Sequence, residues 1–189
     1  MKKNISEEKN PWTTLSSREI YKNEWLRLRE DQVVTPGGKR GIYSVIEKSP
    51  AIAIIPLTKD METYLIGQYR YALNTYSWEI PEGGADPGET NLDAAKRELK
   101  EETGLEALQW TYLGSLYTSN SIMNEIGHIY LAEDLTEGES EPEHTEDLSV
   151  IKIPFREVYQ KVLDCEIKDA LAIIGTMRVH EHLKAKGRM

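Results

Sequence analysis

The sequence predicts a mixed α/β fold (α/β or α+β), with a sheet packed between helices and antiparallel strands ahead of it. Its 189 residues are enough for one well-packed domain with a small appendage. Short apolar runs bounded by Gly, Pro and Asp, the pattern of strands, recur over residues 17–133. Helical spacing of apolar residues is found near residue 95 and again after residue 154. Strands interrupted by one helix and closed by two more are typical of this fold class.

The expected elements follow from these patterns in order along the chain. Strands are predicted at 17–21, 25–34, 41–46, 51–57, 62–69, 76–80, 110–117, 127–133 and 148–153, and closing helices at 154–163 and 167–184. The turn at 36–39, Pro-Gly-Gly-Lys, joins two of the early strands into a hairpin. We therefore expect residues 1–47 to form an N-terminal β-hairpin segment and residues 48–189 to form the main domain.

The helix predicted just after residue 90 has clear start and stop signals. Thr90 or Asn91 is the expected N-cap, and Gly104 stands where a left-handed residue ends a helix. An apolar or neutral stripe is predicted to face the core, formed by Leu92, Ala95, Leu99 and Thr103. This stripe specifies which face of the helix is buried.

Three carboxylates lie immediately beside that buried stripe. Glu98, Glu101 and Glu102 are spaced i, i+3 and i+4, which places them on one helix face. Like charges at these spacings repel by about 0.2–0.5 kcal/mol per pair. A cation that neutralises them explains the arrangement, and clustered hard oxygen ligands suit Mg²⁺ or Mn²⁺.

The stretch before this helix, residues 81–88, is rich in Gly and Pro. It is predicted to be a tight, irregular turn whose backbone can approach a ligand. The run 76–80 ahead of it reads as a strand. Strand, Gly-rich loop and acidic helix together predict a metal site that cleaves a diphosphate.

These residues match the signature of the Nudix hydrolases at each specified position. Gly83, five residues, Glu89, seven residues and then Arg-Glu-Leu-Lys-Glu-Glu-Thr-Gly-Leu at 97–105 make up the match. The resemblance implies a Nudix α/β/α sandwich with a mixed sheet, and hydrolysis of a nucleoside diphosphate linked to a second group.

Flanking residues resemble the ADP-ribose pyrophosphatase and nucleoside-diphosphate-sugar hydrolase branch. They are Gln-Tyr-Arg at 68–70 and Trp-Glu-Ile-Pro at 78–81, together with the N-terminal strands. The resemblance implies Mg²⁺-dependent hydrolysis of substrates such as ADP-ribose, to AMP and ribose 5-phosphate, and of GDP-mannose. It also implies a homodimer in which residues 1–47 mediate dimerisation and bind the base, so that both subunits build each active site.

The resemblance assigns roles around the metal position by position. Glu98 and Glu102 are expected to hold metal directly, and Glu101 directly or through water. Glu82 is expected to give its backbone carbonyl; many relatives have Ala there, so a role for its carboxylate is open. Arg97 is expected to orient the ligand carboxylates through an ion pair with Glu101.

Substrate contacts and the general base are assigned in the same way. Trp25 and Tyr43 are expected to sandwich the base, and an amphipathic edge strand is the alternative for the Trp25 face. Arg70 is expected on the diphosphate, with an internal ion pair to Glu79 as the alternative. The remaining expected substrate contacts are Glu79, Gly83 and Glu125. Glu146 is the expected general base, followed by Glu143 and Glu125.

Composition limits the partners and the alternatives. The net charge of −9 argues against binding nucleic acid, for which a basic stripe is typical. The longest apolar run, 51–57, is too short to span a membrane, so a cytoplasmic protein is expected. Two alternatives stay open: a nucleoside triphosphate or dinucleoside polyphosphate pyrophosphohydrolase, and a sensor that binds ADP-ribose without cleaving it.

Overall fold

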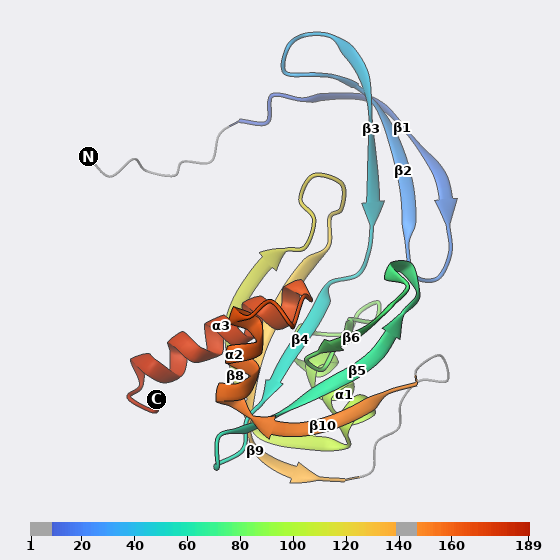
Figure 1. The fold of residues 1–189 in the computed structure, drawn as a ribbon. Coiled ribbons are helices and arrows are strands. Elements are labelled where there is room, and N and C mark those ends of the chain that lie inside the picture. Colours follow the sequence, from blue (N-terminus) through green and yellow to red (C-terminus); the bar gives the residue numbers. More distant parts are fainter. Residues whose placement is uncertain (1–8, 139–146) are drawn as a thin grey trace, which may run out of the picture. The chain divides into compact units, whose positions relative to one another are not determined.

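The computed structural model describes residues 9–138 and 147–189 (Figure 1). Its strands are β1 (Thr13–Lys22), β2 (Arg27–Val34), β3 (Arg40–Glu47), β4 (Ala51–Pro56), β5 (Glu62–Arg70), β6 (Thr75–Glu79), β7 (Glu82–Gly84), β8 (Leu105–Tyr117), β9 (Ile126–Glu137) and β10 (Ser149–Pro154). Its helices are α1 (Asn91–Thr103), α2 (Phe155–Leu163) and α3 (Ala170–Ala185), with a 3₁₀ turn η1 (Tyr71–Leu73). The expected bases Glu146 and Glu143 lie outside the described residues.

The chain divides into two compact units. The first unit contains the residues up to Lys48 together with the distant segment Ser119–Asn124, and the second contains Ser49–Thr118 and Glu125–Met189. The first unit is built on the antiparallel sheet β1-β2-β3. Segment Ser119–Asn124 joins it through backbone bonds, in which Ile46 donates its N–H to the Ile122 carbonyl at 2.8 Å. The sequence pattern did not predict this attachment.

The second unit contains two sheets. One is the mixed sheet β7-β4-β9-β8, in which β4 runs parallel to β9 and the other neighbours are antiparallel. The other is the antiparallel sheet β10-β5-β6. The mixed α/β fold class predicted from the sequence is confirmed.

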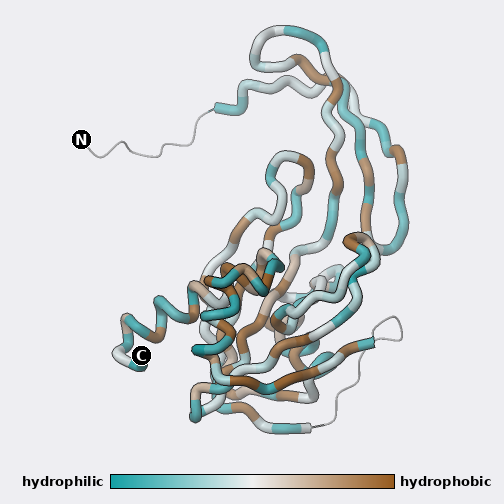
Figure 2. Tube along the Cα trace, in the orientation of Figure 1, coloured by the Kyte–Doolittle hydropathy of each residue, from teal (hydrophilic) through white to brown (hydrophobic). Residues whose placement is uncertain are grey.

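Strand β4 shows why helices cover both faces of the mixed sheet. It is hydrophobic over most of its length (Figure 2), and its side chains alternate between the two faces. Ile52 and Ile54 pack in one core cluster with residues of α1, whereas Ala53 and Ile55 pack in another with residues of α2 and α3. A strand buried on both faces reads as a continuous apolar run. The arrangement is an α/β/α sandwich.

Helix α1 begins and ends where its sequence signals predict. The Thr90 hydroxyl accepts a hydrogen bond from the Asp93 N–H at 3.1 Å, and Gly104 closes the helix at φ 72°. The buried stripe differs in part from the predicted one. Its apolar members are Ala94, Ala95 and Leu99, while the ends of the expected stripe, Leu92 and Thr103, are half-buried. Glu98 and Glu102 occupy buried positions instead, which brings carboxylates to the surface of the core.

The prediction of an irregular turn over residues 81–88 was wrong for its first half. Glu82–Gly84 forms strand β7, which pairs antiparallel with β4 in the register Ile52 to Gly83. Two adjacent glycines suggest a turn, but here their backbone extends the sheet, and Gly83 allows a close approach to Glu98 of α1. The irregular part is confined to the residues between β7 and α1.

Helix α3 starts three residues later than its predicted beginning at 167. Asp169 is its N-cap and accepts a hydrogen bond from the Ala172 N–H at 2.7 Å. Leu171, Val179 and Leu183 hold the helix on the core. In the part of the chain that the structure describes, no helix combines the length and apolar character needed to cross a membrane.

Candidate active site

Two carboxylates of α1 are buried where the helix meets β7. The exposed fraction is 8% for Glu98 and 2% for Glu102. Burying a carboxylate is costly unless hydrogen bonds or a counter-charge stabilise it. Two buried glutamates one turn apart are therefore unusual for a helix whose role is purely structural, and they indicate a functional site.

Gly83 makes room for the Glu98 carboxylate. A Cβ atom added at Gly83 would lie 2.1 Å from the Glu98 carboxyl carbon and 2.2 Å from each of its oxygens. At the neighbouring Gly84, an added Cβ would meet nothing within 4 Å. The first glycine of the motif is thus required by close contact with a carboxylate, and the second is not.

The backbone of β7 also positions the second carboxylate. The Glu82 N–H donates a hydrogen bond to Glu102 Oε2 at 3.0 Å. Since Glu82 lies on a paired strand and Glu102 on the facing helix, this bond connects the two elements. The start of β7 therefore helps to position the Glu102 carboxylate in the last turn of α1.

Arg97 connects the loop, the strand and the helix at this site. Its guanidinium donates to Glu98 Oε1 at 2.8 Å, to Glu101 Oε2 at 3.0 Å and to the Gly84 carbonyl at 2.8 Å. It also forms a two-point contact with Glu89, at 3.1 and 3.0 Å. These bonds, those to Glu89 foremost, raise the pKa of Arg97, and the same contact lowers the pKa of Glu89. The expected ion pair between Arg97 and Glu101 is present.

Arg97→Lys is expected to lower the free energy of unfolding by about 1–3 kcal/mol, because an ammonium group cannot reproduce the forked contacts to three carboxylates and a carbonyl. Urea unfolding measures this loss. Lys96→Arg is the control, because Lys96 is half-exposed on the adjacent position of the same helix and should stay within about 0.5 kcal/mol of the original protein. Equal stability of the two variants would contradict the role given to the Arg97 contacts.

Arg70 forms the internal ion pair that the sequence left as an alternative. Its Nε donates to the two Glu79 oxygens at 2.9 and 3.1 Å, and its Nη2 donates to Glu82 Oε1 at 3.1 Å. Burial opposes the charge on Arg70, but the bonds to Glu79 outweigh it and raise the pKa of the guanidinium. Arg70 thus has carboxylate partners in this structure, and a contact with a diphosphate remains a prediction.

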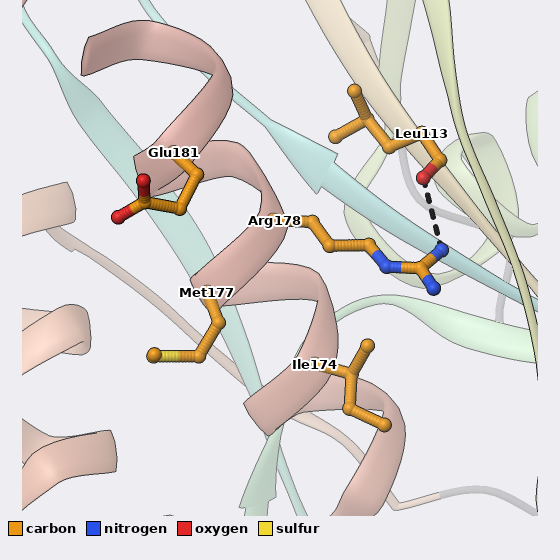
Figure 3. A pocket seen from close by; sticks show the side chains of 5 residues that line it. All are labelled: Leu113, Ile174, Met177, Arg178 and Glu181. Atoms are coloured by element: carbon orange, nitrogen blue, oxygen red, sulfur yellow. Dashed lines mark hydrogen bonds between the residues drawn. The ribbon is translucent and has the colours of Figure 1, made fainter. Parts of the chain in front are cut away.

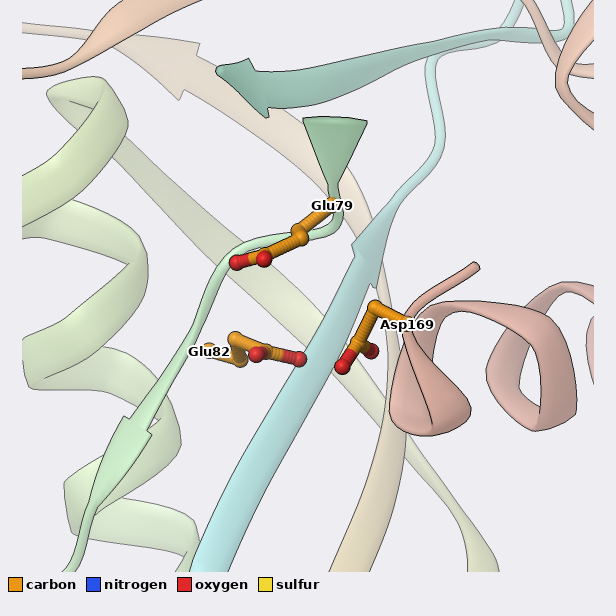
Figure 4. Close-up of side chains that lie close together, drawn as sticks. All are labelled: Glu79, Glu82 and Asp169. Atoms are coloured by element: carbon orange, nitrogen blue, oxygen red, sulfur yellow. The ribbon is translucent and has the colours of Figure 1, made fainter. Parts of the chain in front are cut away.

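An acidic residue that the sequence analysis did not single out lies at the start of α3. Asp169 brings its carboxylate to Glu79 and Glu82, so that one oxygen of each lies within 4.8 Å of the others (Figure 4). Burial, followed by repulsion from Asp169 and Glu79, raises the pKa of Glu82 well above its usual value. The sequence pattern placed Asp169 inside a helix beginning at residue 167, and its proximity to Glu79 depends on the tertiary fold.

The helix carboxylates fit a magnesium ion by the chemistry of their donors. Mg²⁺ is usually bound through one or two carboxylates and completes its octahedron with water and substrate phosphates. Glu98 and Glu102 supply such oxygens one turn apart, and Gly83, which has no side chain, lets the Glu98 carboxylate lie against β7. Glu101 is half-buried and held by Arg97, which suits a supporting contact.

The other expected substrate residues are spread over both units. Glu125 is 8% exposed and directly precedes β9 in the second unit. Trp25, in the first unit, is 66% exposed. Tyr43, also in the first unit, donates a hydrogen bond from its hydroxyl to the Ser121 carbonyl at 2.6 Å. Its ring packs edge-to-face with the Trp12 ring, and the two ring centroids are 5.3 Å apart.

A surface hollow of the second unit lies between β8 and α3, and Figure 3 shows the side chains that line it. It is lined by Leu113, Ile174, Met177, Arg178 and Glu181. The Arg178 guanidinium is occupied by the Leu113 and Ser115 carbonyls, at 2.9 and 3.0 Å. This hollow lacks the converging oxygens of the α1 site, so we place the chemistry at α1 and β7.

Known protein families match this chain over residues 12–170. Residues 47–170 match the family model described as NUDIX domain, and residues 12–46 match that of the nucleoside diphosphate sugar hydrolase N-terminal domain. An ADP-ribose pyrophosphatase of Mycobacterium tuberculosis is 36% identical over 170 residues, covering 88% of this chain and 82% of the relative. A methanol dehydrogenase activator of Bacillus methanolicus is 30% identical over 177 residues, covering 92% and 96%. A crystal structure of an ADP compounds hydrolase superposes with a TM-score of 0.84 at 26% identity, covering 97% of this chain and 100% of its own.

Proposed function

This chain belongs to the Nudix family and is a Nudix hydrolase, and we propose that it hydrolyses nucleoside diphosphate sugars such as ADP-ribose in a Mg²⁺-dependent reaction. The observation that carries the proposal is the pair of buried carboxylates, Glu98 and Glu102, supported by Gly83 and Arg97. The match of residues 12–46 to a sugar-nucleotide hydrolase domain supports the substrate class. GDP-mannose is a second expected substrate.

Glu98 and Glu102 are proposed to hold the metal, with Glu101 assisting and the Glu82 carbonyl completing the protein ligands. A magnesium ion bound there supplies Lewis-acid polarisation of the diphosphate and lowers the pKa of a bound water. Arg97 keeps two of the carboxylates in place through its bonds to Glu98 and Glu101. Ordering these oxygens before substrate arrives reduces the reorganisation needed during reaction.

The proposed reaction breaks one P–O bond of the diphosphate. Water attacks one phosphorus atom, its proton passes to a carboxylate base, and the second phosphate leaves with the bridging oxygen. ADP-ribose then gives AMP and ribose 5-phosphate. We keep Glu146 as the proposed base, a role typically contributing about 10²–10⁴-fold. Among the described residues, Glu125 is the proposed alternative for the general base. It directly precedes β9 and is buried.

The first unit is proposed to bind the nucleotide base and to form a homodimer interface. Trp25 is largely exposed and Tyr43 carries a ring anchored by a hydrogen bond, which suits stacking on a base. Trp25 was expected to start the strand at 25–34 but lies between β1 and β2, and it is the proposed stacking residue. Arg27 and Arg29 of β2 are both paired with Glu47, so we assign them a supporting role in the sheet.

A substrate panel tests the proposed function. ADP-ribose, GDP-mannose, UDP-glucose, NAD, a diadenosine polyphosphate and a dNTP are each incubated with enzyme and Mg²⁺, and the phosphate esters released are quantified with a coupled phosphatase. We expect the highest kcat/KM for a sugar nucleotide, ADP-ribose first. Turnover restricted to the dNTP or the dinucleoside polyphosphate would contradict the proposed substrate class and favour a pyrophosphohydrolase of those compounds. Binding of ADP-ribose without product would favour the sensor.

A further inference from the structure

The three carboxylates of Glu79, Glu82 and Asp169 form a cluster on the other face of β7 from the α1 glutamates. Glu82 pairs with Ala53, which packs against the α2 and α3 side of the sheet. Gly83 pairs with Ile52, which packs against α1 and faces Glu98. Because neighbouring residues of a strand point to opposite faces, the Glu82 side chain leads away from Glu98. The cluster is thus spatially distinct from the proposed catalytic metal site.

One carboxylate oxygen in this cluster lacks a hydrogen-bond partner among the residues that the structure describes. The Glu82 side chain is 10% exposed, and its Oε1 accepts a hydrogen bond from Arg70. Its Oε2 is buried and accepts no hydrogen bond from any residue of 9–138 or 147–189. Figure 4 shows the Glu82 carboxylate directed toward Asp169. A buried carboxylate oxygen aimed at a second carboxylate is costly unless a proton or a cation lies between them.

The charges around the cluster do not balance. Among the described residues, Arg70 is the positively charged one that contacts the cluster, and it donates hydrogen bonds to Glu79 and Glu82. Gln68, which is neutral, donates a hydrogen bond to Glu79 at 3.4 Å. The α3 N-terminus contributes the Ala172 N–H to Asp169. One guanidinium against three carboxylates leaves about two negative charges at the ionised cluster, the charge that one divalent cation neutralises.

We propose that Glu79, Glu82 and Asp169 bind a second divalent cation, Mg²⁺ or Mn²⁺, separate from the catalytic one. Oxygens within 4.8 Å of one another can share one ion, since ligands about 2.1 Å from Mg²⁺ lie up to about 4.2 Å apart and small rotations close the difference. The ion would tie the start of α3 to β7. Because the Glu82 N–H holds Glu102, this bound ion would also fix the support of the catalytic carboxylates.

Counting bound Mn²⁺ by electron paramagnetic resonance of the free ion, near neutral pH, tests this site without measuring activity. Four proteins are compared: the original protein, Asp169→Asn, the double variant Glu98→Gln and Glu102→Gln, and the combination of all three changes. Asn is as good an N-cap as Asp, so Asp169→Asn keeps the start of α3. Glu82→Gln is measured as a second change within the cluster, independent of Asp169→Asn. It retains the backbone carbonyl and an oxygen that can accept the hydrogen bond from Arg70.

We expect the double variant to retain one Mn²⁺ that the combined variant loses or binds at least about tenfold more weakly. Glu82→Gln should weaken the same site, whereas Asp164→Asn, an exposed aspartate at the end of α2, should not. A double variant that binds no Mn²⁺, as if a shared proton occupied the cluster, would overturn the proposal, as would unchanged binding in both Asp169→Asn and Glu82→Gln. Loss of Mn²⁺ in Asp169→Asn with none lost in the double variant would sustain this site and reject the catalytic one.

Discussion

Glu102→Gln is expected to reduce kcat for ADP-ribose by about 10³-fold or more while the protein stays folded. A metal-bound carboxylate contributes several kcal/mol to stabilising charge in the transition state, and each 1.36 kcal/mol is about tenfold in rate. The glutamine keeps a carbonyl oxygen that can accept the Glu82 N–H, now at 3.0 Å from Oε2. The stability of the fold should therefore change little, whereas the proposed metal ion loses a negatively charged ligand. Steady-state kinetics across Mg²⁺ concentrations measures the effect.

The matched control is Glu106→Gln, at the start of β8 just beyond the end of α1. Its side chain is 65% exposed and pairs with Lys100 at the surface. An exposed pair of this kind contributes little, so activity should stay within about twofold of the original enzyme. Glu102→Gln with near-original turnover at saturating Mg²⁺ would remove Glu102 from the metal site.

Gly83→Ala is expected to lower the activity strongly while changing the stability only slightly. The added methyl group would occupy the place of the Glu98 carboxylate, 2.1 Å from its carbon. That group is the far end of a flexible side chain and can swing aside, so the free energy of unfolding should change by only about 1 kcal/mol. Glu98 would then sit away from its working position, and a misplacement of about 1 Å can cost about 10²-fold in rate. We expect kcat/KM to fall about 10²-fold, with a higher Mg²⁺ requirement.

Gly84→Ala provides the comparison one residue away on the same strand. An added Cβ there meets nothing within 4 Å, and the residue is exposed. We expect near-original activity and stability. If both alanine variants were equally active, the contact between Gly83 and Glu98 would have no bearing on function. If both were unfolded, the strand and not the carboxylate would be the sensitive element.

The acidic helix could be read from the sequence in part. The burial of Glu98 and Glu102 was not predicted, because both were expected beside the core-facing stripe and not within it. The cap Thr90 and the terminal Gly104 depend on local hydrogen bonds and could be read from the sequence. The ion pair between Arg97 and Glu101 is likewise a matter of i, i+4 spacing on one helix.

Features set by tertiary contacts could not be read in this way. Asp169 reaches Glu79 and Glu82 across about 90 residues of chain, and a helical pattern over 167–184 does not report where the start of that helix lies in space. Strand β7 was taken for a turn because glycines 83 and 84 satisfy both patterns, and pairing with β4 decides between them. The attachment of 119–124 to the first unit has the same origin, because Tyr43 and Ser121 meet only in the fold.

Identification of the products formed from ADP-ribose tests the proposed function most directly. The reaction is run with Mg²⁺ and, in parallel, with excess chelator, and the products are separated by ion-exchange chromatography. We expect AMP and ribose 5-phosphate in equal amounts with Mg²⁺, none with chelator, and none above background with Glu102→Gln. Recovery of intact ADP-ribose after prolonged incubation with Mg²⁺, or equal product yield with and without chelator, would contradict metal-dependent hydrolysis at the α1 glutamates.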